Sequence, residues 1–219
     1  MGFSATSSAQ ADLSSAMRVA LNDPVTFAEF DAAIRHSSTS TSPGFSGLSF
    51  NMIKRWPEDL KRQVFDALSV LWAERTTPAG WKIRMMCLKP KTDDMYPAKE
   101  DLRPLALLES LRKLWERILL NRMQRVWETH HPFTENQHFG PNRSTSDALL
   151  TLRNVIEEAH VMEQPLYVSS WDIKKAFDSV SKPLLIMAWV RMGVPADIAT
   201  WIVALDNDGK TVVRTPHGH

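Results

Sequence analysis

VSSWDIKKAFDSV, residues 168–180, passes from β-branched, strand-like sequence to a helical pattern, with Asp172 and Asp178 on either side of the change. Extended backbone would separate the two acids by ~20 Å, and a helix would separate them by ~9 Å along its axis and roughly 240° around it. Neither arrangement lets both carboxylates bind one metal ion. The pattern therefore favours Asp172, at the end of an expected strand over 166–172, as a metal ligand, and Asp178 as a local cap.

The rest of the chain is expected to be mostly helical. Apolar periodicity predicts helices over 26–36, 57–75, 105–126 and 144–161, and two more that are separated near Gly193 and Pro195. Thr26 and Glu29 form a capping-box pattern, and Ser181 is placed to cap a later helix. A second strand is expected over 81–88, whereas the Ser- and Ala-rich residues 1–22 are expected to be a flexible leader. Helices and a few short strands in irregular order, without an internal repeat, indicate an α+β fold.

Composition limits the classes of protein to consider. The chain has 219 residues and 43% hydrophobic content, so it can bury a sizeable core. It has no apolar run of the ~18 residues that a membrane helix needs, and its start is too polar for a secretory signal. Cys87 is the only cysteine, which excludes an internal disulfide and a thiolate zinc cluster. We therefore expect an intracellular protein, in the nucleus or the cytoplasm.

Positive charge is concentrated in one segment, although the net charge is only +1. Residues 82–125 hold eleven Lys and Arg against six Asp and Glu. Such a stripe fits a phosphate-bearing partner, but a solvated helix face gives similar counts. On the helix predicted over 105–126, we expect Arg112, Arg122 and Arg125 to bind nucleic acid along a cationic face. The competing interpretation is that Glu109 and Glu116 already pair with these bases and leave a neutral surface.

The stretch WDIKKAFDSV at 171–180 resembles the first palm motif of the reverse transcriptases of non-LTR retrotransposons. Four more blocks resemble that family in the same order, so the resemblance covers about residue 24 to the end. They are SPGFSGLSFNMIKRWP at 42–57, PAGWKIRMMCLKPK at 78–91, DLRPLALLESLRKLWERILLNRM at 101–123 and QHFGPNRSTSDALLTL at 137–152. The resemblance implies the fingers (23–163) and the first part of the palm (164–219) of a right-hand polymerase.

The resemblance also implies roles for individual residues. Asp172 and the backbone carbonyl of Ile173 match metal ligands of a site for two Mg²⁺ ions. Phe177 matches the bulky residue that favours deoxynucleotides over ribonucleotides. Lys91 and Arg103 match the pair that holds the incoming triphosphate, and Lys89 competes with Lys91 because a register shift of two keeps the same face.

Template contacts are implied as well. Gln137 and Arg143 lie in a turn that resembles the one beside the template strand, although the turn is shorter here than in the family. The implied partners are an RNA template, a DNA primer and deoxynucleoside triphosphates.

Two blocks of the family's pattern are absent from this sequence. Neither the Gln-Gly block nor the aromatic-x-Asp-Asp hairpin, which completes the metal site, is present among the 219 residues. We therefore expect a piece of an RNA-directed DNA polymerase that ends before that hairpin and is inactive as an isolated chain. The alternative is a non-catalytic remnant of such an enzyme that binds nucleic acid or acts as an interaction module.

Overall fold

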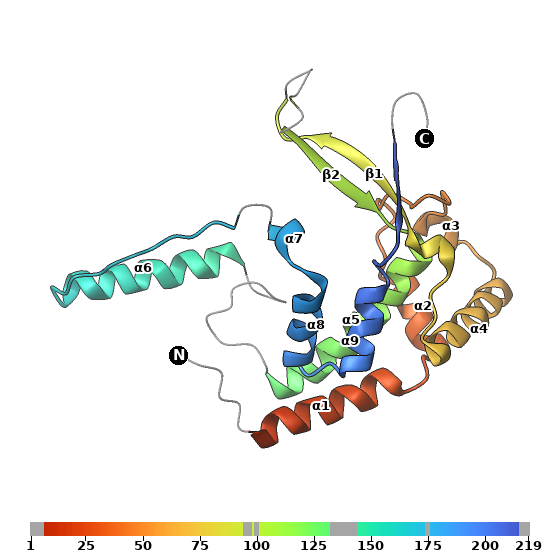
Figure 1. Cartoon of the computed structure of the whole chain (residues 1–219), viewed down its shortest axis with the longest axis horizontal. Helices are drawn as coiled ribbons and strands as arrows, with labels where there is room; N and C mark the ends of the chain where they lie inside the picture. The colour runs from red at the N-terminus through yellow and green to blue at the C-terminus, as the bar shows by residue number, and fades with distance from the viewer. Residues whose placement is uncertain (1–6, 94–97, 99–100, 132–143, 174–175, 215–219) are drawn as a thin grey trace.

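The computed structural model of the chain describes residues 7–93, 98, 101–131, 144–173 and 176–214 (Figure 1). In this described part of the chain helices dominate and three strands form one small sheet, so the expected helix-rich α+β fold is confirmed. No described helix has both the length and the apolar composition that crossing a membrane requires. In chain order the elements are α1 (Ser7–Asn22), α2 (Phe27–Arg35), α3 (Phe50–Lys54), α4 (Glu58–Glu74), η1 (Ala79–Lys82), β1 (Ile83–Pro90), β2 (Leu102–Leu107), α5 (Ser110–His130), α6 (Thr145–Val161), α7 (Ala176–Ser179), α8 (Lys182–Arg191), α9 (Ala196–Ala204) and β3 (Lys210–Val213).

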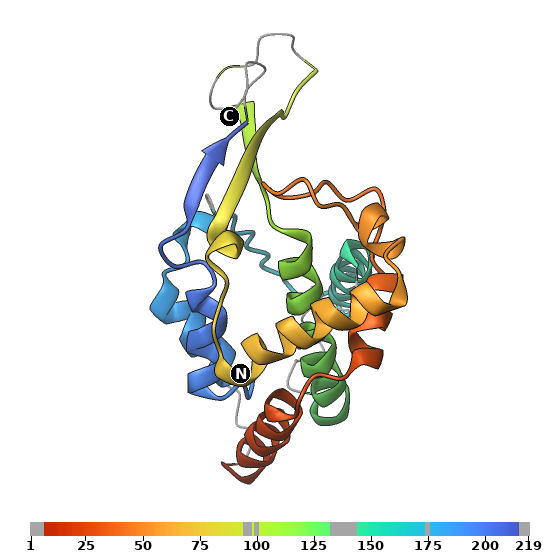
Figure 2. The ribbon, with the colours of Figure 1, turned by 90° about the vertical axis from the view of Figure 1, so that its right-hand side faces the viewer.

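Helix α5 is the centre of the core. Its apolar residues recur at helical spacing, and Leu114, Trp115, Ile118 and Leu119 are buried among side chains of the surrounding helices. Trp115 packs edge-on against Trp72 of α4, with 5.2 Å between the ring centroids. Figures 1 and 2 show α5 in the middle of the body, with α1, α2, α4, α8 and α9 around it.

Several helices form where the sequence predicts them, and two of them begin with a capping box. Thr26 caps α2 through a capping box with Glu29, and Ser144 caps α6 through a capping box with Asp147. The predicted helices over 57–75 and 144–161 are confirmed as α4 and α6, and the pair separated near Gly193 and Pro195 is confirmed as α8 and α9. The strand predicted over 81–88 is confirmed as β1, which begins two residues later.

The flexible leader expected over 1–22 is wrong for residues 7–22, which form α1. Leu13, Met17 and Leu21 recur every fourth residue, and all three are buried, Met17 and Leu21 completely. The stripe is narrow because the residues between are mostly Ala and Ser, but it packs on α5 and on the turn at Gly193. A Cβ at Gly193, which has a φ of +90°, would lie 2.5 Å from Cγ of Leu13.

The sheet has the order β2-β1-β3 and differs from the prediction at two places. Residues 105–107, expected to begin a helix, form the end of β2, which pairs antiparallel with β1. Residues 210–213, which had no predicted structure, form β3 and pair parallel with β1, Ile83 opposite Lys210. Figure 2 shows β3 beside β1.

The strand expected over 166–172 is wrong, because no described strand pairs with this segment. A strand needs a hydrogen-bonded neighbour, and residues 163–173 have none among the described strands. Helix α6 has no buried residue, and Figure 1 shows α6 and the segment after it extending away from the body. Trp171 is 89% exposed, so the chain next to Asp172 is not packed on the core.

Candidate functional site

The β1–β2 hairpin brings two predicted phosphate-binding residues to one face. The register places Lys89 of β1 directly opposite Arg103 of β2, and both side chains are exposed. Directly opposite residues of an antiparallel pair point to the same face, with Cα atoms ~4.5–5.5 Å apart. Two like charges in this arrangement repel each other, so an anion between them would be stabilising.

Lys91 follows β1 and continues the same pairing. Its backbone N–H donates to the carbonyl of Asp101 over 2.8 Å. Lys91 itself lies in a bend just beyond the end of β1 at Pro90. Lys89 and Arg103 share one face of the hairpin and Lys91 follows directly after β1, and we call these three cations the hairpin face.

Asp172, the predicted metal ligand, lies in irregular chain with its side chain exposed to solvent. Ile173 is exposed as well. The backbone at Phe177 and Asp178 belongs to α7, but the predicted roles of these two side chains lie outside what the structure describes. Gln137 and Arg143 also lie outside the described residues.

Of the predicted site residues whose side chains the structure describes, Asp172 is the one that offers a carboxylate to a metal ion. Among the described residues there is no group of three or more His, Cys, Asp or Glu side chains that could hold a metal ion. Asp172 is thus one candidate ligand, and the described part of the chain does not assemble the two-ion site that the resemblance implies.

The expected exposure of Arg112 is wrong, since only 2% of this residue is exposed. Its guanidinium donates to Glu116 over 2.7 Å, to Asp206 over 2.9 Å, and to the backbone carbonyls of Trp81 and Leu205. Burial opposes its charge, but pairing with Glu116 and Asp206 raises the pKa of Arg112. Arg112 therefore joins α5 to η1 and to the chain just after α9.

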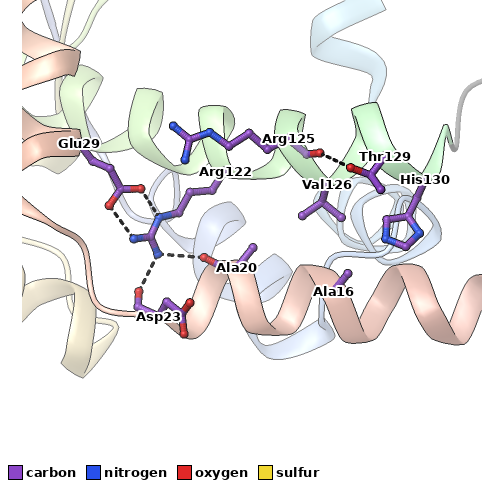
Figure 3. Close-up of a pocket in the computed structure, with 9 residues that line it drawn as sticks. All are labelled: Ala16, Ala20, Asp23, Glu29, Arg122, Arg125, Val126, Thr129 and His130. Carbon is purple, nitrogen blue, oxygen red and sulfur yellow. Dashed lines mark hydrogen bonds and ion pairs between the residues drawn. The ribbon is translucent and has the colours of Figure 1, made fainter.

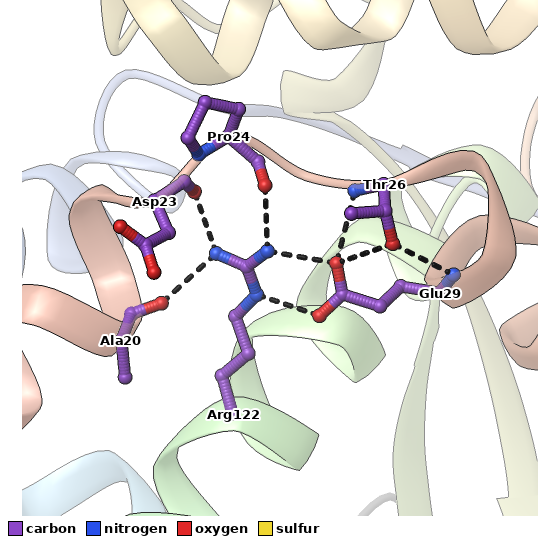
Figure 4. Close-up of polar contacts among 6 residues, drawn as sticks. All are labelled: Ala20, Asp23, Pro24, Thr26, Glu29 and Arg122. Carbon is purple, nitrogen blue, oxygen red and sulfur yellow. Dashed lines mark hydrogen bonds and ion pairs between the residues drawn. The ribbon is translucent and has the colours of Figure 1, made fainter.

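Arg122 is buried in the same way, 7% exposed, and its expected place on a cationic surface is also wrong. Figure 4 shows its guanidinium between the end of α1 and the start of α2. It makes a bidentate pair with Glu29, at 2.8 and 2.7 Å, and donates to the carbonyls of Ala20, Asp23 and Pro24. An arginine has five N–H donors, and these contacts use all of them.

Glu29 is the acidic partner in this network, and sequence reasoning identified it only as part of a capping box. Its carboxylate accepts hydrogen bonds from Arg122 and from the backbone and hydroxyl of Thr26. Partial burial alone would raise its pKa, but the bonds from Arg122 and Thr26 lower the pKa of Glu29 from 4.5 to about 2. The apolar spacing of α5 places position 122 on the buried side of the helix, and this signal could have identified the pair of Arg122 and Glu29.

Arg125 is the predicted α5 arginine that the structure leaves exposed. It lines a pocket of about 330 Å³ between α1 and α5, together with Ala16, Ala20, Thr129 and His130 (Figure 3). Arg122 also lines this pocket, but all of its N–H donors are already in hydrogen bonds. Of the three arginines predicted to form a cationic face on α5, Arg125 is therefore exposed, whereas Arg112 and Arg122 are buried.

Comparison with known proteins finds a family match over the region that contains both the hairpin face and Asp172. Residues 89–217 match the reverse transcriptase (RNA-dependent DNA polymerase) family. The chain belongs to this family. The predicted family resemblance is confirmed, whereas the division into fingers (23–163) and palm (164–219) stays a prediction.

Three relatives are proteins of transposable elements. The chain is 28% identical, over 89% of its length, to the retrovirus-related Pol polyprotein from type-1 retrotransposable element R2 of Popillia japonica. It is 26% identical, over 76% of its length, to the transposon TX1 uncharacterized 149 kDa protein of Xenopus laevis. It is 25% identical, over 72% of its length, to the probable RNA-directed DNA polymerase from transposon BS of Drosophila melanogaster. The chain spans 26%, 12% and 17% of the length of these relatives, respectively.

Proposed function

We propose that this chain is part of an RNA-directed DNA polymerase of a non-LTR retrotransposon, which adds deoxynucleotides to a primer on an RNA template. The observation that carries the proposal is the family match over 89–217, which includes the hairpin face and Asp172. The names of the relatives support the retrotransposon source.

In this proposal the hairpin face binds the triphosphate of the incoming nucleotide. Arg103 offers a planar fork for two phosphate oxygens, and Lys89 or Lys91 offers a compact charge beside it. The antiparallel register supports this role, since it places Lys89 and Arg103 directly opposite each other before any ligand arrives.

Asp172 is proposed as a ligand for a divalent ion, together with the Ile173 carbonyl, and Phe177 as the residue that selects deoxynucleotides. Gln137 and Arg143 are proposed to contact the template. For the isolated chain we propose nucleotide binding without primer extension, because the described residues include one candidate metal ligand and no group of three or more that could hold an ion. The alternative function, a non-catalytic nucleic-acid-binding module, is favoured by the exposure of the segment around Asp172.

Binding of a fluorescent deoxynucleoside triphosphate to the chain tests the role of the hairpin face. Arg103→Gln is expected to weaken binding about tenfold, because it removes a charge-assisted pair of hydrogen bonds. Lys89→Gln and Lys91→Gln show which lysine shares the phosphate. Arg55→Gln, which removes an exposed cation from the C-terminal end of α3, is the matched control and should bind as the wild type does.

Equal binding by the wild type and all three hairpin variants would contradict the proposed triphosphate site and favour the non-catalytic module. A second test places Asp172→Asn in the polymerase that contains this chain. Primer extension should be lost while the fold, followed by circular dichroism, is unchanged, because the side chain is exposed. Unchanged extension would exclude Asp172 as a ligand.

A further inference from the structure

The loop between α2 and α3 carries an unbroken run of hydroxyl side chains over residues 37–42, SSTSTS. Ser37 is buried, and its hydroxyl donates to the carbonyl of Ala33 over 2.8 Å, whereas Ser42 is exposed and lies outside any helix or strand. Pro43 follows, and proline favours extended backbone at the residue before it. Ser42 is therefore accessible to an enzyme that must bring a reactive group up to its hydroxyl.

Two cations of α5 hold the two ends of this run. Nζ of Lys113 donates to the backbone carbonyl of Ser42 over 2.8 Å, and Nη1 of Arg117 donates to the carbonyl of His36 over 2.9 Å. A carbonyl carries no net charge, so these bonds place the cations against the loop without neutralising them. Lysine has three donors and arginine five, so both side chains can donate further hydrogen bonds.

The same two cations line a groove of about 380 Å³ between the loop and α5. Thr41, the residue before Ser42, lines it as well, so Ser42 lies at its rim. Glu116 is the carboxylate of the groove, and it pairs with the buried guanidinium of Arg112 at 2.7 Å. Burial lowers the pKa of Lys113, and an anion beside it would stabilise its charged form. The groove is therefore suited to an anion attached to the loop.

We propose that Ser42 is a phosphorylation site and that Lys113 and Arg117 bind its phosphate. The reaction requires a proline-directed protein kinase and a nucleoside triphosphate. Oγ of Ser42 forms a bond to the γ-phosphorus, the bond from that phosphorus to the bridging oxygen breaks, and the nucleoside diphosphate leaves. The hydroxyl proton passes to the base of the kinase. Because the modified hydroxyl and the carbonyl that Lys113 already binds belong to one residue, the phosphate lies within reach of Nζ.

The phosphate changes how the loop is attached to α5. It adds about −1.5 to −2 charges and three strong acceptor oxygens, which balance the charges of Lys113 and Arg117. Bonds between ionised groups are roughly twice as strong as those to neutral carbonyls. Phosphorylation therefore locks residues 36–42 against α5. The inference uses neither the hairpin face nor Asp172, so it does not depend on the proposed function.

Two other hydroxyl residues precede a proline in this sequence, Thr77 and Thr215. Thr77 is half-buried between α4 and η1, and Thr215 lies outside the described residues. A kinase that selects by the following proline alone would modify all three positions, whereas accessibility favours Ser42 over Thr77.

Treatment of the folded chain with a proline-directed serine/threonine kinase and adenosine triphosphate, followed by tandem mass spectrometry, tests the site. Ser42 should carry the phosphate, and Ser42→Ala should lose it. Ser40→Ala is the matched control, because Ser40 is an exposed hydroxyl of the same run that no proline follows. Absence of phosphate, or phosphate only on residues other than Ser42, would overturn the inference.

Phosphorus NMR of the modified chain tests the role of the cations. The second pKa of a free phosphoserine is about 6, and neighbouring cations lower it. The Ser42 phosphate, assigned by its absence from Ser42→Ala, should bind its second proton about tenfold more weakly than the same phosphoserine in a peptide of residues 36–49. A groove variant with Lys113→Gln and Arg117→Gln should match the peptide.

Two further variants separate charge from folding. Lys113→Arg together with Arg117→Lys keeps both charges and should keep the pKa of the phosphate low. Arg18→Gln together with Arg62→Gln removes two cations in exposed ion pairs on α1 and α4 and should also leave it low. A phosphate that titrates alike in the wild type, the groove variant and the peptide would overturn the inference, as would an equal rise in pKa in the Arg18 and Arg62 control.

Discussion

Replacing Glu29 by Gln removes the charge from the network that joins α1, α2 and α5. Gln keeps the shape of the side chain and one acceptor oxygen, but its amide nitrogen would face the guanidinium of Arg122, which has only donors. Arg122 would then remain buried beside three backbone carbonyls without its carboxylate. We therefore expect Glu29→Gln to destabilise the fold at neutral pH.

The pKa of Glu29 sets the size of the effect. A fall in pKa from 4.5 in unfolded chain to about 2 in the folded protein corresponds to ~3 kcal/mol at pH 7. Because the folded pKa is the lower one, this stabilisation is complete above about pH 4.5 and is lost as the pH falls towards 2. At pH 3 about 1.4 kcal/mol should remain.

Urea unfolding followed by tryptophan fluorescence, at several pH values between 3 and 7, measures the difference between the wild type and Glu29→Gln. Other acids titrate equally in both proteins and cancel in the difference. Glu58→Gln is the control, because Glu58 and its partner Arg62 are exposed and such pairs contribute at most ~1 kcal/mol. A difference for Glu29→Gln that is the same at pH 3 and pH 7, or no larger than that of the control, would refute the reasoning.

Two further substitutions test the packing of the core. Arg112→Met leaves two carbonyls and two carboxylates without their common donor and should cost ~3 kcal/mol in urea unfolding; a loss below ~1 kcal/mol would mean that solvent replaces these contacts. Gly193→Ala places a Cβ 2.5 Å from Cγ of Leu13 at a positive φ and should cost ~2 kcal/mol or more, whereas Gly80→Ala, with open space around it, should be neutral. A Gly193→Ala chain as stable as Gly80→Ala would show that α1 is not held against this turn.

Sequence reasoning succeeded where the determining forces are local. The capping box of Thr26 and Glu29 and the apolar period of α4 act within a few residues, so they can be read from one segment. Family membership was predictable for a related reason. The blocks around Arg103 and Asp172 are short patterns that can be recognised within one segment, and both lie in the region that matches the family.

Features that depend on distant partners were not predictable in the same way. The strand expected over 166–172 has suitable residues but no described neighbour to pair with, and β3 exists because 83–86 lie beside it. Charge counting placed Arg112 and Arg122 with Arg125 on one surface, because it could not see that Asp206 and Glu29 lie opposite the first two. For the same reason, the sequence did not reveal the hydrogen bonds that Lys113 and Arg117 donate to backbone carbonyls of Ser42 and His36, more than 70 residues earlier.

The parallel pairing of β1 with β3 has a consequence for synthesis of the protein. About 120 residues separate the end of β1 at Pro90 from the start of β3 at Lys210. At translation rates of 5–20 residues per second, the ribosome needs ~6–24 s to make that stretch. During this interval one edge of β1 has no partner strand, and an open edge can pair with another chain. Slower translation across residues 91–209 should therefore increase aggregation of the nascent protein, and a chaperone that covers the β1 edge should reduce it.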